Sequence, residues 1–322
     1  MDLYGLSDVV LEDMALKKVS WILSIVLLTP LGGVAGIVDD VRGALEEQKI
    51  SAAETALHAY RSRQGVTPEY VEALSWMARS SLAEKQFDQA MGYAKETKSL
   101  TIGLLKGKSL DSDEHLATAL GAAYEVQSQA LAKQGQVAPA TTLLQVALGT
   151  YGNTSIGPRL QKNLNLITLV GRPAPSLLGS EYLGAKPVPL AQLKGKPVLL
   201  FFWAHWCGDC KAEAPIVARL RSEFSSQGLT VVGPTQRYGY TAQEDHASPQ
   251  AELKYIEAVR SKFYQGLPEM AVPVSKQNFK TYGASTTPTM VLLDRQGKVA
   301  MYHPGALSYE ELRGEILKVA GQ

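Results

Sequence analysis

The feature that most constrains how this chain can fold is a pair of cysteines at the point where a buried strand meets a helix. Residues 198–203 are six apolar residues in a row, a pattern typical of a strand covered on both faces. Apolar residues then recur at helical spacing, at Ile216, Val217, Leu220 and Phe224. The strand is therefore predicted to end near Ala204 and the helix to begin near Cys207.

Cys207 and Cys210 are spaced for redox chemistry at such a junction. Free N–H groups and the helix dipole favour an anion at a helix N-terminus, so the first sulfur is expected to ionise to the nucleophilic thiolate. Two intervening residues let Cys210 reach back and close a disulfide. Half of a zinc site is the alternative, but no metal site is predicted, because zinc usually takes four ligands and a second close pair of cysteines or histidines is missing. The chain has no third cysteine for lipid attachment or a structural disulfide.

The sequence around the two cysteines resembles a known signature. Residues 202–210, Phe-Trp-Ala-His-Trp-Cys-Gly-Asp-Cys, resemble the Phe-Trp-Ala-x-Trp-Cys-x-x-Cys signature of thioredoxin-like proteins. Residues 211–215 resemble the Cys-x-x-Glu-x-Pro continuation found in the TlpA/ResA branch. The likeness extends over residues 171–322. It implies a thioredoxin-like α/β/α sandwich that catalyses thiol–disulfide exchange.

The same resemblance implies roles for individual residues. Cys207 would attack a partner disulfide, and Cys210 would resolve the mixed disulfide, leaving a Cys207–Cys210 redox disulfide. Thr287 and Pro288 resemble the cis-proline loop of thioredoxins, where a cis bond leaves backbone groups free to pair with an extended substrate. A trans proline that simply opens a strand is the alternative.

Glu213 is a candidate for proton transfer. It lies three residues after Cys210 and hence on the same helical face. In TlpA/ResA-type proteins an acid at this place is near the sulfurs and is implicated in proton transfer, whereas the alternative is a solvated surface glutamate. The chain departs from thioredoxin at Phe201, where a buried aspartate is usual. Phenylalanine cannot relay a proton, so Glu213 or water must assist Cys210.

Two residues beside Cys207 complete the predicted site. Trp206 is expected to form a partly exposed apolar surface for substrate, whereas Trp203, within the strand, fits the core. Asp209 stands where the family commonly has proline, and its charge opposes the stabilisation of the thiolate by the helix dipole. A less stabilised thiolate predicts a reducing rather than a strongly oxidising pair.

Residues 1–36 are predicted to direct export. A short basic region at 14–18, an apolar stretch and a tail of small residues are typical of a secretory signal peptide. Acidic residues 2–13 are unusual before such a signal, so translation is hypothesised to begin at Met14. An uncleaved membrane anchor is the competing interpretation, because residues 19–38 carry no charge, and a buried helix is a third. The first two place the bulk of the protein in the periplasm or on the membrane facing it.

Residues 39–170 are alanine-rich and helix-periodic, which predicts a helical domain. Residues 85–90 and 133–140 resemble the turns of tetratricopeptide (TPR) repeats, and residues 48–53 form a fainter copy. Small residues at matched positions would let paired helices approach closely; these are Ala53, Ala90 and Ala140. Two interpretations stay open: a groove that binds a peptide or protein partner, and a helical stack that only packs on the redox domain.

Residues 171–175 contain two prolines and a glycine and mark the boundary to a second domain, 171–322. The predicted fold class is therefore α plus α/β: TPR-like helical repeats followed by a thioredoxin-like sandwich. The strand at 270–274 is predicted at a sheet edge, because it contains proline. The remaining elements expected are a strand at 229–233, a long loop at 235–249, a helix at 253–263, a hairpin of strands at 289–294 and 298–302, and a closing helix at 309–319.

These features predict an exported thiol–disulfide oxidoreductase that reduces protein disulfides and receives electrons from a membrane-bound or soluble thiol. No cofactor is predicted, and 32 basic against 31 acidic residues give no electrostatic basis for nucleic-acid binding. A peroxiredoxin-like enzyme is one alternative, weakened because its Pro-x-x-x-Thr-x-x-Cys pattern is absent. A TPR scaffold with a vestigial redox pair is another, and the retained Cys207, Cys210 and Pro288 argue against it.

Overall fold

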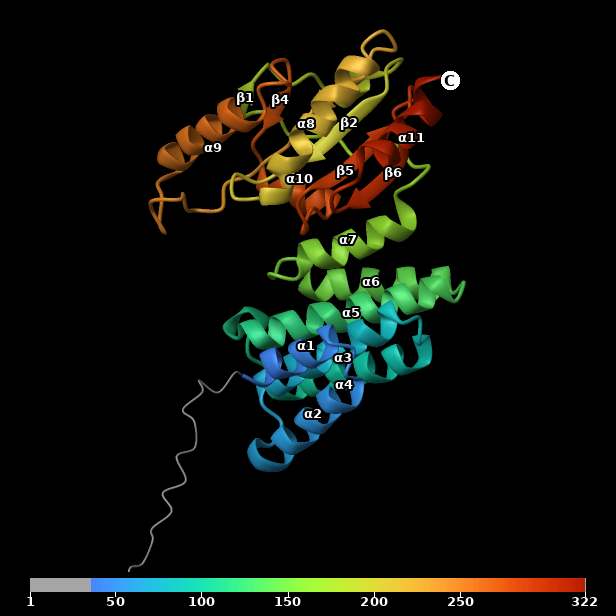
Figure 1. Ribbon diagram of the computed structural model, residues 1–322, viewed down its shortest axis with the longest axis vertical. Coiled ribbons are helices and arrows are strands. Elements are labelled where there is room, and N and C mark those ends of the chain that lie inside the picture. The colour runs from blue at the N-terminus through green and yellow to red at the C-terminus, as the bar shows by residue number, and fades with distance from the viewer. Residues whose placement is uncertain (1–35, 322) are drawn as a thin grey trace, which may run out of the picture. The chain divides into compact units, whose positions relative to one another are not determined.

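A computed structural model describes residues 36–321, so the segment predicted to direct export lies outside the described residues except for Gly36. Helices come first and a mixed α/β region follows, as the predicted fold class requires (Figure 1). Among the helices of residues 36–321, none combines the length and the apolar character needed to cross a bilayer. The helices of the first region are α1 (Ile37–Glu46), α2 (Ile50–Gln64), α3 (Pro68–Ala83), α4 (Phe87–Leu105), α5 (Glu114–Lys133), α6 (Val137–Tyr151) and α7 (Gly157–Thr168), with a 3₁₀ turn at Leu110–Ser112.

Three tight turns join α1 to α2, α3 to α4, and α5 to α6, at the places where the sequence predicts turns. Each contains one residue of positive φ: Gln48 at 59°, Lys85 at 60° and Gly135 at 78°. The three matched alanines that follow these turns are fully buried, which agrees with close helix packing. The three helical hairpins are therefore present, and their assignment as TPR repeats stays a prediction.

The last helix of this region contacts the α/β region. Helix α7 packs against α10 (Lys276–Tyr282) and β6 (Val299–Pro304). The Asn165 side chain on α7 donates a hydrogen bond to the carbonyl oxygen of Thr281 at 3.4 Å. Just after α7, the Gly171 N–H donates to the Val299 carbonyl at 2.8 Å. These contacts tie the segment between the helical repeats and the sheet to the sheet's far edge.

The sheet has six strands in the order β1-β4-β3-β2-β5-β6. Strands β2, β3 and β4 run parallel, whereas β1, β5 and β6 pair antiparallel with their neighbours. A parallel central unit with an antiparallel hairpin on one side places the end of β2 in the middle of the sheet. Besides β6, the strands are β1 (Tyr182–Gly184), β2 (Val198–Phe202), β3 (Thr230–Val232), β4 (Ala271–Pro273) and β5 (Thr289–Leu293).

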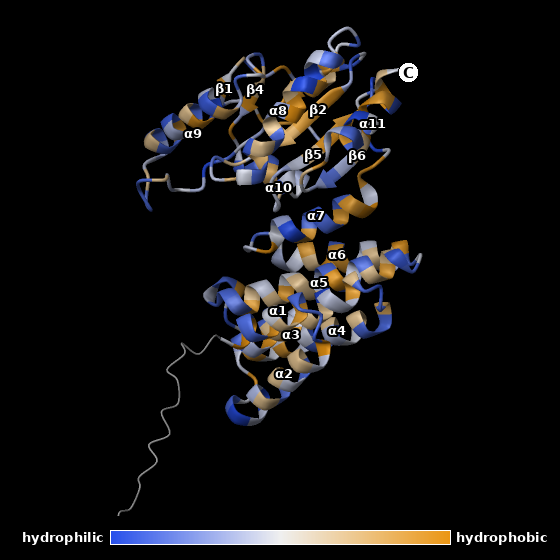
Figure 2. Cartoon of the chain, viewed as in Figure 1, coloured by the Kyte–Doolittle hydropathy of each residue, from blue (hydrophilic) through white to orange (hydrophobic). Residues whose placement is uncertain are grey.

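Strand β2 is buried on both faces, as its unbroken apolar sequence predicts (Figure 2). Because side chains alternate along a strand, Leu199, Phe201 and Trp203 face one core. That core is shared with α8 (Gly208–Glu223), α9 (Pro249–Phe263) and α11 (Tyr309–Ala320). The remaining side chains of β2 face a second core that includes α10. Helices on both faces and a buried central strand make the predicted three-layer arrangement.

The prediction that residues 270–274 form an edge strand is wrong. Strand β4 lies between β1 and β3, because the short strand Tyr182–Gly184 covers its outer side. Pro273 is tolerated there because it is the last residue of the strand and its carbonyl still accepts a hydrogen bond from Thr235 N at 2.9 Å. Strand β1 is only three residues long and ends in glycine, so its sequence carries little strand signal.

Candidate active site

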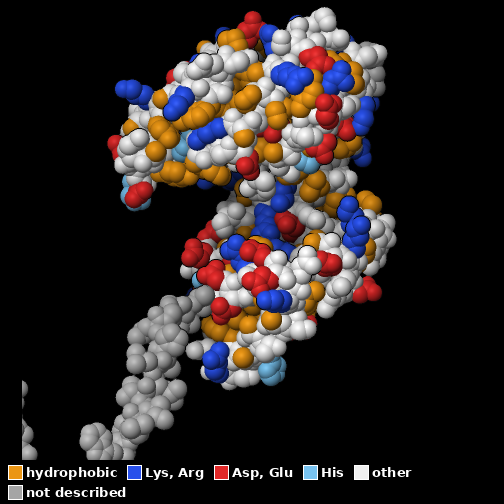
Figure 3. Space-filling model, in the orientation of Figure 1, with side chains coloured by type: hydrophobic (Ala, Val, Ile, Leu, Met, Phe, Trp, Pro, Cys, Tyr) orange, Lys and Arg blue, Asp and Glu red, His pale blue; other side chains and the backbone are white. Residues whose placement is uncertain are grey.

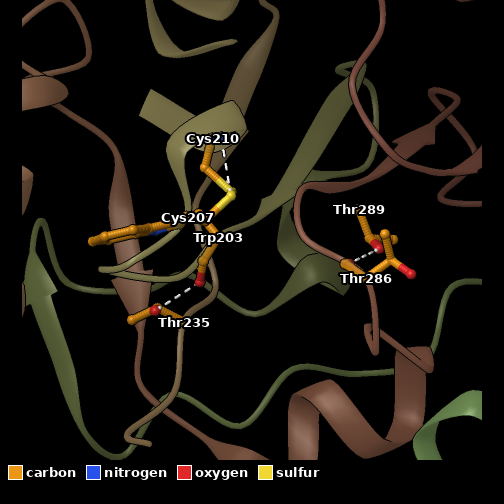
Figure 4. The surroundings of a disulfide bond; sticks show 6 residues. All are labelled: Trp203, Cys207, Cys210, Thr235, Thr286 and Thr289. Atoms are coloured by element: carbon orange, nitrogen blue, oxygen red, sulfur yellow. Dashed lines mark hydrogen bonds between the residues drawn. A yellow bond between two sulfur atoms is a disulfide. The ribbon is translucent and has the colours of Figure 1, made fainter. Parts of the chain in front are cut away.

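Cys207 and Cys210 form a disulfide at the N-terminus of α8, with their Cα atoms 5.3 Å apart (Figure 4). Cys207 is the N-cap residue, and its sulfur accepts a hydrogen bond from the backbone N–H of Cys210 at 3.0 Å. This is the helix-capping position that the sequence predicts for the first sulfur. The resemblance to thioredoxin-like proteins implies that the first cysteine is exposed, but in the disulfide form Cys207 is only 3% exposed and Cys210 is fully buried.

The loop before β5 has the predicted geometry, because the Thr287–Pro288 peptide bond is cis. Figure 4 shows this loop, marked by Thr286 and Thr289, among the surroundings of the disulfide. The Thr289 hydroxyl donates to the Thr286 carbonyl at 2.6 Å, and the Pro288 carbonyl accepts from Gly305 N at 2.8 Å. These bonds hold the loop on both sides of the proline. The Thr287 hydroxyl is buried and has no hydrogen-bond partner among residues 36–321.

The two tryptophans divide as predicted. Trp203 is buried in the core, its indole N–H donates to Gly233 O at 2.9 Å, and its carbonyl accepts from the Thr235 hydroxyl at 2.8 Å (Figure 4). Trp206 is 48% exposed, and its ring lies edge-on to Tyr238 with the centroids 5.5 Å apart. An exposed tryptophan beside a redox sulfur is an apolar surface on which a substrate chain can lie.

Glu213 lies inside the first core rather than in solvent. Its side chain is on α8 and is 3% exposed, and Oε1 has no hydrogen-bond partner among the described residues. Burial, together with the negative charge of Asp209, raises the pKa of Glu213 to about 7. A carboxyl with a pKa near neutrality can accept and return a proton at working pH. The solvated-glutamate alternative is therefore wrong.

Phe201 lies in apolar surroundings. Its ring packs against Tyr264 with the centroids 6.2 Å apart, on the face of β2 that α8 covers. The Tyr264 hydroxyl is buried without a partner among residues 36–321, and burial raises its pKa, so it is not a base near neutral pH. Phe201 and Tyr264 therefore offer no base near neutral pH on this face of β2, and proton transfer by Glu213 stays a prediction.

A buried hydrogen bond behind the active-site turn, between His205 and Glu252, was not predicted from the sequence. His205 and Glu252 are each 1% exposed, and His205 Nε2 lies 3.2 Å from Glu252 Oε1. The carboxylate also accepts hydrogen bonds from the backbone N–H groups of Tyr238 and Gly239, the latter at 2.9 Å. The His205 ring meets the edges of Tyr238, Tyr240 and Tyr255 at centroid distances of 5.5, 5.2 and 5.3 Å.

This network fixes the long loop 235–248 against the turn that carries the cysteines. Glu252 on α9 bonds both the loop backbone and His205, which lies two residues before Cys207. Tyr238 is placed by the same bonds and contacts Trp206. Burial lowers the pKa of His205, which favours the neutral imidazole. The histidine within the Cys-x-x-Cys signature was a visible signal, but its partner lies 47 residues away in sequence.

Comparisons with known proteins agree with this site. Residues 188–320 match the family described as Thioredoxin-like domain. The thiol-disulfide oxidoreductase ResA of Bacillus thuringiensis (strain Al Hakam) is 27% identical over 150 residues, which cover 47% of this chain and 78% of ResA. The thiol:disulfide interchange protein DsbE of Xylella fastidiosa (strain Temecula1) is 28% identical over 155 residues, which cover 47% of this chain and 69% of DsbE. A crystal structure of a putative DsbE from Chlorobium tepidum is 28% identical, covers 47% of this chain and 98% of that one, and has a TM-score of 0.36. Residues 188–320 form a thioredoxin-like domain, and the protein is a thiol–disulfide oxidoreductase similar to ResA and DsbE.

Proposed function

We propose that the protein works outside the cytoplasm as a reductant of disulfides in other proteins. The observation that carries the proposal is the Cys207–Cys210 pair at the start of α8, with the buried Glu213 one turn further along the same helix; its Oε1 has no hydrogen-bond partner among residues 36–321. The signal-like or anchor-like sequence of residues 14–36 supports export. Asp209 beside the first sulfur supports a reducing pair, since its charge disfavours the thiolate.

The proposed cycle begins with the dithiol form. The Cys207 thiolate attacks one sulfur of the substrate disulfide, forming a mixed disulfide and releasing the other substrate sulfur as a thiolate that takes up a proton. Cys210 then gives its proton to Glu213 or to water and attacks the Cys207 sulfur. This closes the Cys207–Cys210 disulfide and releases the second substrate thiolate. The substrate gains two electrons, and a second thiol partner must return two electrons to the enzyme.

Two surfaces near the sulfurs support an extended protein substrate. Trp206 offers an exposed apolar ring, and the cis Thr287–Pro288 bond places a main-chain segment beside the redox pair. An added peptide strand can pair with such a segment through backbone hydrogen bonds. Backbone pairing of this kind does not depend on one particular side chain. It therefore does not by itself select one substrate protein.

Reduction of insulin disulfides by dithiothreitol tests the enzymatic proposal. The wild-type chain should accelerate insulin precipitation, and Cys207→Ser should lower the rate to that of the reductant alone, because the attacking sulfur is gone. Equal rates of insulin precipitation for the two proteins would contradict the enzymatic proposal and support the scaffold interpretation. Consumption of hydrogen peroxide at a rate that exceeds insulin reduction would favour the peroxiredoxin interpretation.

A trapped intermediate tests the direction of attack and names the substrate. Cys210→Ser should retain a mixed disulfide between Cys207 and its substrate, because the resolving thiol is missing. Mass spectrometry of the adduct from cells identifies the partner, and Cys207→Ser is the control that should trap none. Adducts formed only by Cys207→Ser would reverse the assignment of the two sulfurs.

A further inference from the structure

A cavity of about 510 Å³ opens in the helical region between α3 and α5 and contains none of the redox residues. This volume is within the range of roughly 300–1,000 Å³ that is usual for ligand sites. Its walls combine apolar side chains with basic ones, and mixed charges are visible over the helical region in Figure 3. The lining residues are Leu82, Ala83, Phe87 and Val126, then Arg79, Lys85 and Lys133, and finally Glu125 and Gln129.

Arg79 in this cavity lacks a counterion. It forms no salt bridge within residues 36–321, and its Nε is buried without an acceptor. Its guanidinium lies 4.3 Å from the ring centroid of Trp76, and Arg42 lies 4.8 Å from the same ring. The buried Trp76 indole N–H also has no acceptor among the described residues. Burial and the nearby positive charge of Arg159 lower the pKa of Arg79 to about 10, so the group stays charged at neutral pH.

The two carboxylates whose charges act on Arg79, Glu125 and Glu72, are already engaged. Glu125 Oε2 receives Arg159 Nε at 2.9 Å and Lys162 Nζ at 3.0 Å. Burial opposes ionisation of Glu125, but these two cations outweigh it and hold its pKa at about 2. Glu72, whose charge also acts on Arg79, bonds His115 Nδ1 at 2.7 Å. Among residues 36–321 no ion pair therefore neutralises the charge of Arg79, and the exposed Lys85 and Lys133 add to it.

We propose that this cavity binds an acidic peptide segment of a partner protein. One side-chain carboxylate would accept hydrogen bonds from the Arg79 guanidinium, whose planar donors match a carboxylate. A neighbouring apolar side chain would lie against Leu82 and Phe87, and the two lysines would attract the peptide from the rim. The apolar wall favours a peptide over a small free acid, because a small acid would leave that wall in water.

Fluorescence anisotropy on the full oxidised chain tests the proposal without any redox turnover. The probes are fluorescein-labelled, C-terminally amidated octapeptides with two glutamates and one leucine among alanines, in all orders. The matched set carries glutamine in place of glutamate. We expect saturable binding of acidic peptides at about 50 mM salt, weakened as salt rises, and none of the glutamine set. Arg79→Met should weaken binding at least about tenfold, and Arg79→Lys less, because it keeps the charge but loses the planar donors.

Lys95→Met is the matched control, since Lys95 is an exposed residue of α4 that does not line the cavity; its affinity should stay within about twofold of wild type. Circular dichroism checks that Arg79→Met is folded. If Arg79→Met is unfolded, the surface double variant Lys85→Met/Lys133→Met tests the proposal instead. Its affinity for the acidic peptides should fall about threefold or more. The proposal is overturned if no acidic peptide binds, if glutamine peptides or free glutamate bind equally well, or if the variants bind like wild type. Failure here leaves the insulin and trapping experiments unaffected.

Discussion

Glu252 on α9 and Glu213 on α8 are both buried acids beside the turn that carries Cys207, but their surroundings are opposite. Glu252 receives His205 and two backbone N–H groups, so each of its oxygens is used. Glu213 has an oxygen without a partner, and its pKa is raised to about 7. A satisfied buried acid fixes geometry, whereas an unsatisfied one is free to take up and release a proton. The comparison separates a positioning residue from a catalytic candidate.

The largest expected effect is on stability, from Glu252→Ala. The change leaves His205 and the N–H groups of Tyr238 and Gly239 buried without their acceptor, which should cost about 3 kcal/mol. Urea unfolding measures the loss. Glu257→Ala on the same helix is the control, because its partner Arg260 is partly exposed and the pair should be worth less than about 1 kcal/mol. Equal losses for the two variants would contradict the assignment of Glu252 as the fixing group.

Glu213→Gln should change how stability depends on pH. The pKa of Glu213 is higher in the folded chain, about 7, than its ordinary value of 4.5, so its protonated form stabilises the fold below pH 4.5. That contribution, up to about 3 kcal/mol, is lost as the pH rises to 7, and glutamine removes the loss. The variant should therefore gain stability over wild type as the pH increases from 4.5 to 7. Insulin reduction should fall about tenfold, since the proton acceptor is gone.

Glu223→Gln on the same helix is a control whose stability should depend on pH in the opposite sense. Hydrogen bonds from Tyr309 and Arg313 lower the pKa of Glu223, so its stabilising contribution exists at neutral pH and is lost on acidification. The stability difference between this variant and wild type should shrink as the pH falls. A Glu213→Gln curve parallel to wild type at all pH values would show that this carboxyl titrates normally.

The same contrast explains which parts of the site were predictable from sequence. Cys207, Cys210 and the Thr287–Pro288 bond lie in short local signatures, so their geometry followed from a few adjacent residues. The pairing of His205 with Glu252 depends on α9 packing against the turn, and nothing near either residue in sequence indicates the other. The unbroken apolar run at 198–203 predicted that Phe201 and Trp203 are buried, because a run of adjacent apolar residues is a local pattern.

Errors arose where distant segments meet. Strand β4 was expected at the edge of the sheet, but β1, a three-residue strand about 90 residues earlier, pairs with its outer side. In the helical region, alanine positions and turns were predictable, but the basic cavity was not. Arg79, Glu125 and Arg159 come from three different helices, and only their packing leaves one cation without an anion. Charge counted along the chain, +1 overall, conceals such a local excess.

The smallest expected effect is on the reduction potential, from Asp209→His. The same substitution also tests the raised pKa of Glu213. Asp209 is exposed, so its repulsion of the Cys207 thiolate is close to the bulk-water value of about 0.7 kcal/mol at ~6 Å. Asp209→His removes that repulsion, stabilises the reduced form, and should raise the reduction potential by about 15 mV. Equilibration with glutathione buffers measures the shift, and Glu315→His on α11 is the control that should leave it unchanged. Asp209→His should also lower the pKa of Glu213, because the Asp209 charge helps to raise it. A potential that stays constant or falls would contradict the view that this exposed charge opposes the thiolate, and the helix dipole alone would then determine the redox balance of the pair.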